Sequence, residues 1–196
     1  MPQRKVTARA QWLPVAAGAL CTAALTLLLA LGLKRAAELQ SASAALQLAS
    51  ELSTRPDYIH SELTLVQRGL ESQTWIGEPV RAVEQSARIS AAALRDLQLN
   101  VRAAGLESEP RVMQPLQAAT RGWTPLAQKL PRVTGATLTG LYADSSTGSQ
   151  LSPAGRELKA AVDDLLQHEA ASTDVIGAAF SQVAAELRRN VVESGR

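Results

Sequence analysis

The sequence predicts an all-α protein in which an N-terminal transmembrane helix precedes an elongated antiparallel four-helix bundle. Three observations support this prediction. Residues 10–33 form an apolar run without a charge. The rest of the chain repeats apolar residues at spacings of three and four, which places them on one helical face. Hydrophobic residues make up 46% of the chain but aromatic residues only 3%, so the core must consist of Leu, Val and Ala, which suit closely packed helices.

Residues 10–33 are expected to cross a membrane. About 20 apolar residues span a hydrocarbon core of about 30 Å, and this run is longer than that. A signal peptide has a shorter apolar region followed by a small-residue cleavage site. Here Lys34 and Arg35 follow the run instead. We therefore expect an uncleaved signal anchor.

The charge distribution favours one orientation. Three basic residues precede the apolar run and two follow it, and residues 1–35 contain no acidic residue. The positive-inside rule then predicts residues 1–9 as a cytoplasmic tail and residues 34–196 as a domain on the other side of the membrane. The margin is narrow and leaves the reverse orientation open. The body itself is slightly acidic, with 15 basic and 18 acidic residues after position 35, so no nucleic-acid partner is predicted.

Small residues recur every four positions within the apolar run. Such a stripe lets transmembrane helices approach closely, although an anchor rich in Ala and Thr also produces this spacing by chance. The possible self-association stripe consists of Gly18, Thr22, Thr26 and Ala30.

The anchor is expected to continue as a helix to Ser53. There Thr54, Pro56 and Asp57 resemble a capping box with proline in the first turn, which predicts a stop and a new helix. The new helix is expected to end near Gly77, and its apolar face comprises Ile59, Leu63, Val66 and Leu70.

The next helix shows the clearest periodicity, a heptad seam that ends before Gly105. The seam comprises Val80, Val83, Ala87, Ser90, Leu94, Leu97, Val101 and Ala104. Beside it, an arginine occupies every seventh position: Arg81, Arg88, Arg95 and Arg102. This row is a possible face for a ligand or partner helix, and the favoured alternative is a solvated row that pairs with acids such as Glu84.

The following segment keeps the same rhythm through several prolines. We expect two or three short helical pieces on one line, with kinks near Gly122–Pro125 and at Pro131, because an interior proline costs about 3 kcal/mol unless the helix kinks or restarts. The apolar positions are Val112, Leu116, Ala119, Trp123, Leu126, Leu130 and Val133. Trp75 and Trp123 are interpreted as plugs of the bundle, and stacking of these rings on a ligand is the alternative.

A polar loop over residues 143–151 is expected to lead into the last helix. Ser152 and Pro153 suit its N-cap and first position, and the helix should run to about Val192. Its predicted inner face comprises Leu158, Val162, Leu165, Ile176, Val183 and Leu187.

The sequence suggests no enzyme. His60 and His168 lack companion ligands, so neither a metal site nor another cofactor is predicted. Nothing resembles a phosphate-binding glycine loop or a nucleophile elbow. Cys21, the single cysteine, excludes an internal disulfide.

Two stretches resemble the sensor region of type IV pilus chemotaxis transducers: VEQSARIS at residues 83–90 and LQAATRGWTPL at residues 116–126. The resemblance covers roughly residues 10–195. It implies that the protein lies in a bacterial inner membrane, with residues 34–196 as a periplasmic sensor for a small ligand or a pilin-like protein. In that family a second span and a cytoplasmic signalling hairpin follow the bundle, and this sequence contains neither.

Two functions remain in competition. The first is a membrane-anchored sensory bundle that signals by helix displacement within a homodimer, for a small molecule whose identity is unknown. The second is a single-span adaptor subunit of a pilus, secretion or envelope complex, which would bind a protein partner through its helices.

Overall fold

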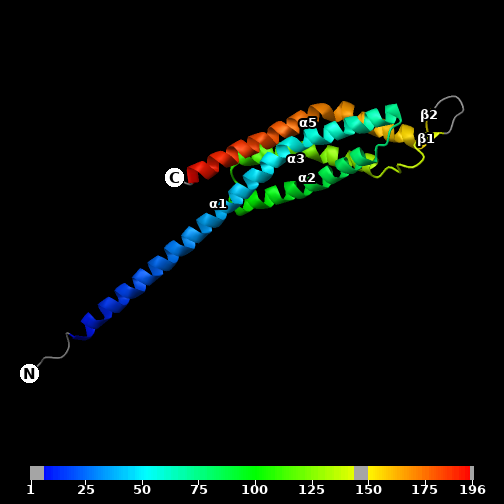
Figure 1. Cartoon of the computed structure of the whole chain (residues 1–196). Coiled ribbons are helices and arrows are strands. Elements are labelled where there is room, and N and C mark those ends of the chain that lie inside the picture. Colours follow the sequence, from blue (N-terminus) through cyan, green and yellow to red (C-terminus); the bar gives the residue numbers. More distant parts are fainter. Residues whose placement is uncertain (1–6, 144–149, 195–196) are drawn as a thin grey trace, which may run out of the picture.

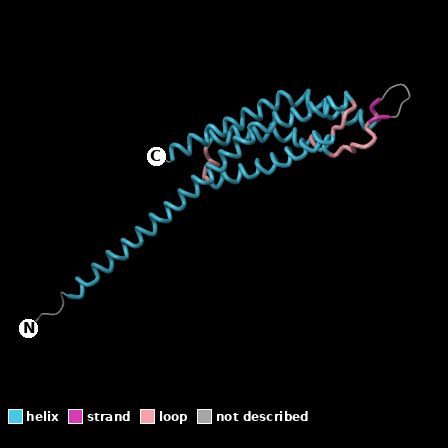
Figure 2. The backbone as a smooth tube through the Cα atoms, viewed as in Figure 1, coloured by secondary structure: helices cyan, strands magenta, loops and turns pink. Residues whose placement is uncertain are grey.

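The computed structural model describes the backbone of residues 7–143 and 150–194, and the side chains of the same ranges except at 7–19, 143 and 168–171. The prediction of an all-α protein is confirmed over these residues (Figures 1 and 2). The elements, in chain order, are α1 (Thr7–Ser72), α2 (Gly77–Ala103), α3 (Pro110–Lys129), α4 (Pro131–Thr134), β1 (Tyr142–Ala143), β2 (Gln150–Leu151) and α5 (Pro153–Ser194).

Helix α1 is one uninterrupted helix, so the predicted stop at Ser53 is wrong. Pro56 lies inside the helix and is buried, which removes the donor for one backbone carbonyl. Leu52, Ile59 and Leu63 are each at most 2% exposed around it. Burying each such side chain contributes about 1.5–3 kcal/mol, which together exceeds the cost of about 3 kcal/mol for an interior proline. Tertiary packing therefore carries the helix through the proline.

Helices α1, α2, α3 and α5 lie along one another, each running opposite to the previous one in the chain (Figure 1). Helix α1 packs along both α2 and α5, and α3 packs along α5. Every predicted inner residue of α3 and α5 is buried in the shared core. In α2, six of the eight seam residues are buried, and Ala87 and Ala104 are half-buried.

The body has two distinct ends. At the proximal end the apolar segment of α1 leaves the body, and Arg35, Ala104 and Ser194 line one small hollow there. At the distal end lie the α1–α2 connection, α4 and the β1–β2 hairpin, farthest from the apolar segment (Figure 2). The N-terminal half of α1 thus extends beyond the other helices at the proximal end.

The remaining boundaries follow local chemistry. Helix α3 passes through Pro115 and Pro125, so no new helical piece begins near Gly122–Pro125, whereas a separate helix, α4, begins at Pro131. The Ser152 hydroxyl accepts a hydrogen bond of 3.1 Å from the Gly155 amide, which confirms the predicted N-cap of α5. The ends of the predicted loop pair as β1 and β2, and residues 144–149 between them lie outside the described part of the chain.

Candidate functional site

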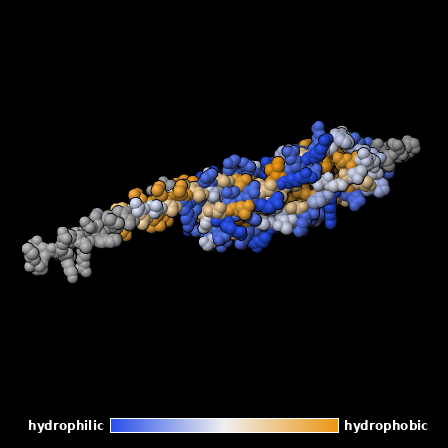
Figure 3. Space-filling model, turned by 90° about the horizontal axis from the view of Figure 1, so that it is seen from below, coloured by the Kyte–Doolittle hydropathy of each residue, from blue (hydrophilic) through white to orange (hydrophobic). Residues whose placement is uncertain are grey.

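The described part of the chain holds one helix that is long and apolar enough to cross a membrane, and it lies near the N-terminus. Its apolar window is not buried anywhere within the protein. Leu20 and Leu33 are each 72% exposed. Figure 3 shows this stalk in orange where it is described, whereas the body is mostly blue with scattered orange. A contiguous exposed apolar surface of this kind marks a membrane or protein contact.

The small-residue stripe lies within this segment. Thr22, Thr26 and Ala30 are all exposed, while the surroundings of Gly18 lie outside the described side chains. The Thr26 hydroxyl donates to the carbonyl oxygens of Thr22 and Ala23, at 3.0 and 2.9 Å. The Thr26 hydroxyl is therefore satisfied within its own helix and can face an apolar environment.

The four arginines of the predicted row are exposed along α2, and each contacts a group close to it in sequence. Two contact backbone carbonyls one turn earlier and two contact glutamates. The contacts are Arg81 Nε to Gly77 O at 3.1 Å, Arg95 Nε to Ala91 O at 3.2 Å, Arg88 with Glu84, and Arg102 Nε to Glu107 Oε2 at 3.3 Å. They do not converge on one point, and Arg102 is the only one of the four that lines the groove described below.

The two tryptophans of the body have opposite environments. Trp123 is 5% exposed within the core, as expected of a plug. Trp75 is 67% exposed in the α1–α2 connection, so its interpretation as a plug is wrong. The Trp75 ring occupies the space where a Cβ of Gly77 would lie, and Gln73 before it has a φ of +58°. A glycine and a left-handed residue thus let the connection turn with the indole outside the core.

An open groove of about 880 Å³ runs between α2 and α3 at the proximal end. These two helices make few close backbone approaches, unlike the other neighbouring pairs. Val101 and Leu116, at 1% and 3% exposure, form an apolar floor together with Met113. The polar and charged lining consists of Gln98, Arg102, Glu107, Ser108, Gln117, Thr120 and Arg121.

The groove was not predicted from the sequence, because each apolar seam describes a single helix. Val101 and Leu116 belong to the seams of consecutive helices, and Arg102 and Arg121 lie beside those seams. The weak signal was that polar side chains stand beside a buried position on both helices. These are Gln98 and Arg102 beside Val101, and Gln117, Thr120 and Arg121 after Leu116. Periodicity alone does not reveal that the two helices stay apart.

Beneath the proximal half of the body, α1 contributes only alanines to the fully buried core. Ala42, Ala45 and Ala49 are at most 6% exposed, whereas the distal half contributes larger residues from Leu52 onward. Ala45, Ala49, Val101 and Leu116 belong to one continuous cluster. Alanine buries little area, and the larger residues Leu46 and Leu48 of this stretch are only partly buried against the core, so α1 buries less apolar area here than at the distal end.

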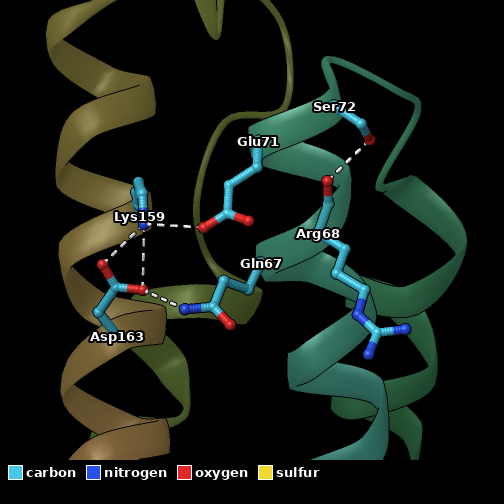
Figure 4. Close-up of polar contacts among 6 residues, drawn as sticks. All are labelled: Gln67, Arg68, Glu71, Ser72, Lys159 and Asp163. Carbon is cyan, nitrogen blue, oxygen red and sulfur yellow. Dashed lines mark hydrogen bonds and ion pairs between the residues drawn. The ribbon is translucent and has the colours of Figure 1, made fainter.

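A polar cluster joins α1 to α5 near the distal end (Figure 4). Lys159 Nζ lies 2.9 Å from Asp163 Oδ2 and 3.5 Å from Glu71 Oε1, and Gln67 Nε2 donates to Asp163 Oδ1 at 2.8 Å. The hydrogen bond to Asp163 raises the pKa of Lys159, and burial opposes it. In Figure 4 the Arg68 side chain points away from this cluster. Lys159, Asp163, Glu71 and Gln67 thus pair with one another across the two helices, which indicates a structural link rather than a ligand site.

A second hollow, of about 630 Å³, lies at the distal end between α5 and the segment around α4. Among the described residues, its charged lining consists of Arg132 and Glu157, whose charges cancel. Its apolar floor is limited to Leu158 among fully buried residues. The α2–α3 groove therefore offers the stronger combination of apolar floor and net charge. In the described residues, no three His, Cys, Asp or Glu side chains are placed to hold a metal ion.

No protein-family model, curated protein or solved structure matches this chain.

Proposed function

We propose that this chain is a single-span protein of the bacterial inner membrane whose antiparallel four-helix bundle lies in the periplasm and recognises a ligand. The observation that supports this proposal is the continuity of α1 from Thr7 to Ser72. One helix contains both the exposed apolar segment and a quarter of the packed core. A change in how the body packs is then transferred to the membrane segment without an intervening joint.

The recognition site in this proposal is the α2–α3 groove. Its floor residues Val101 and Leu116 belong to the same continuous core as Ala45 and Ala49 of α1, and this core extends through the whole body. A ligand that binds the groove can change the packing of α1 only if it has different affinities for two arrangements. The alanine face supplies such an element, because small residues let a helix shift by 1–2 Å at low cost, as is typical of helix movements in signalling.

The membrane part is tested with a matched pair of arginine substitutions. Leu27 in the apolar segment and Leu99 on α2 are 62% and 60% exposed. Arginine near the centre of a membrane helix costs about 2.5–3.5 kcal/mol in insertion, so Leu27→Arg should lower membrane integration while Leu99→Arg should not. Carbonate extraction of the full chain measures integration. A reporter active only in the periplasm, fused after Arg196, tests the orientation, and an inactive fusion would reverse it.

The coupling is tested by filling the groove covalently. In a Cys21→Ser background, Thr120→Cys is modified with N-benzylmaleimide, because Thr120 lines the groove. Thr124→Cys, one turn further along α3 and exposed, is the control. Hydrogen exchange should change over residues 34–50 of α1 for the first protein alone. If neither modification changes that exchange, α1 does not respond to the groove and the sensory proposal fails.

The exposed Trp75 favours a second function, a single-span adaptor subunit of a pilus, secretion or other envelope complex. Tryptophan is enriched at energetically dominant positions of protein interfaces, and this one lies at the end farthest from the apolar segment. Photo-crosslinking from position 75 in cells separates the two functions. Capture of a single large partner by the probe at position 75, but not by a probe at Ser181 on α5, would favour the adaptor.

A further inference from the structure

We propose that the α2–α3 groove selects a small amphipathic anion, a carboxylate joined to a compact apolar group. This inference rests on the proposed recognition function and names the chemistry of the ligand. It follows from three features of the groove: its floor, its charges and its size.

The floor requires an apolar portion in the ligand. Val101 and Leu116 are almost fully buried beneath the groove, and Met113 is half-buried beside them. A methionine side chain is unbranched and polarisable, so it adapts to an aromatic or aliphatic group. A fully hydrated ion such as phosphate would leave this floor uncovered.

The charges require an anionic portion. Arg102 and Arg121 line the groove from α2 and α3, and Glu107 is its one acidic lining residue, so the lining carries a net positive charge. Arg102 is paired with Glu107 at 3.3 Å, but their side chains are 74% and 61% exposed. So exposed a pair contributes little to stability, and a ligand carboxylate can therefore replace Glu107 at little cost. Arg121 Nε makes a long hydrogen bond of 3.4 Å to Gln117 O of its own helix. Both guanidinium groups can therefore turn toward a carboxylate, which they bind in bidentate geometry.

The size limits the ligand to a small molecule. The groove volume of about 880 Å³ lies within the range of about 300–1,000 Å³ typical of small-molecule sites. Glu107 and Ser108, from the α2–α3 connection, line its proximal end. A partner helix would have to extend past this connection, whereas a compact ligand would not.

The experiment uses the full chain in nanodiscs with methionine methyl groups labelled with ¹³C. The chain has two methionines, so Met113 gives one of two resonances, assigned with Met113→Leu. The probe is 4-phenylbutyrate, whose ring shifts a nearby methyl resonance. The matched probes are 4-phenylbutan-1-ol without the charge, 4-phenylbutylamine with the opposite charge, and butyrate without the ring.

Phenylbutyrate should shift the Met113 resonance saturably, and the alcohol should bind about tenfold more weakly or worse, because a hydrogen bond to a charged group is worth about 1.5–3 kcal/mol. Arg121→Gln should weaken phenylbutyrate binding to a similar degree. Arg88→Gln, in the same arginine row but outside the groove lining, should leave it unchanged. The inference is overturned if the alcohol or the amine binds as tightly as phenylbutyrate, a comparison that uses only the unmodified chain. It is also overturned if Arg88→Gln weakens phenylbutyrate binding as much as Arg121→Gln does.

The same samples distinguish this inference from the proposed function. Hydrogen exchange over residues 34–50 is measured at saturating phenylbutyrate. Selective binding without a change in that exchange would support the ligand class and overturn transmission through α1. A change in exchange produced equally by all four probes would support transmission and overturn the ligand class.

Discussion

Gly177 of α5 lies against Ser53 of α1, so closely that a Cβ atom at position 177 would be 3.0 Å from the Ser53 carbonyl oxygen. The adjacent residue, Ile176, packs closely against α3. A Cβ atom added to Gly122 of α3 would lie 2.7 Å from the Cγ1 atom of Ile176. Residues 176 and 177 thus mark the point where α5 is packed tightly between two helices. Small residues at such points allow neighbouring backbones to approach.

Gly177→Val should destabilise the protein by about 1–3 kcal/mol, because the added side chain meets backbone that cannot move aside without separating α1 from α5. Ala178→Val is the matched control, since residue 178 is the next along the same helix and is exposed. Its cost should be limited to helix propensity, about 0.5 kcal/mol. Urea denaturation of the full chain in detergent, followed by circular dichroism, measures both. Equal losses would mean that the α1–α5 contact is not tight at this point.

Stability should fall as the pH rises above about 10. The hydrogen bond to Asp163 raises the pKa of Lys159 above its ordinary value of 10.5, and burial raises the pKa of Tyr142 above 10.0. Both groups therefore hold protons in the folded chain that they release in the unfolded chain. The folded state binds more protons in this pH window, so its stability decreases as the pH rises.

Substitutions identify the groups responsible for that alkaline loss. Lys159→Met and Tyr142→Phe should each reduce the difference in unfolding free energy between pH 8 and pH 11. Tyr58→Phe controls for loss of a tyrosine hydroxyl, because Tyr58 lies on the exposed face of α1. An alkaline loss that stays the same in both variants would assign it to other groups.

Two serines of α2 weaken the core. Ser86 and Ser90 are 2% and 0% exposed, and among the described residues neither hydroxyl has a hydrogen-bond partner. A buried unsatisfied hydroxyl costs about 1–3 kcal/mol. Ser90→Ala should therefore raise the unfolding free energy by about 1 kcal/mol or more. Ser181→Ala, on the exposed face of α5, should gain only the helix propensity of alanine, about 0.5 kcal/mol. A loss of stability in Ser90→Ala would show that the hydroxyl is satisfied in solution.

The inner faces of the helices could be predicted from the sequence because burial in this protein follows the helical period. Leu158, Val162 and Leu165 of α5, and Val112 and Leu116 of α3, are all buried where the spacing of three and four places them. Caps were equally readable, because Ser152 and Gly105 act through local chemistry. Gly105 ends α2 with a φ of +71°, a conformation that glycine adopts without strain.

Predictions failed where tertiary packing outweighs a local signal. The residues around Pro56 read as a helix start, yet burial of Leu52 and Ile59 on either side keeps α1 continuous. Pro125 likewise does not end α3. The groove was missed for a related reason: it depends on the separation of α2 and α3, which is a property of the pair. Trp75 was misplaced because it lies in a connection, where helical periodicity gives no information on burial.

The two described tryptophans should respond oppositely to substitution and to quenching. Trp123→Ala should destabilise the protein by about 3–5 kcal/mol, because removing a buried tryptophan leaves a cavity in the core. Trp75→Ala should change stability by no more than about 0.5 kcal/mol, since the ring is mostly in solvent. In a Trp12→Phe background, acrylamide should quench the emission of a Trp123→Phe protein strongly and that of a Trp75→Phe protein weakly. Strong quenching in both would mean that the core opens around α3 and that Trp123 does not anchor it. Weak quenching in both would mean that Trp75 is covered in solution, as expected if the distal end already holds a partner or a second copy.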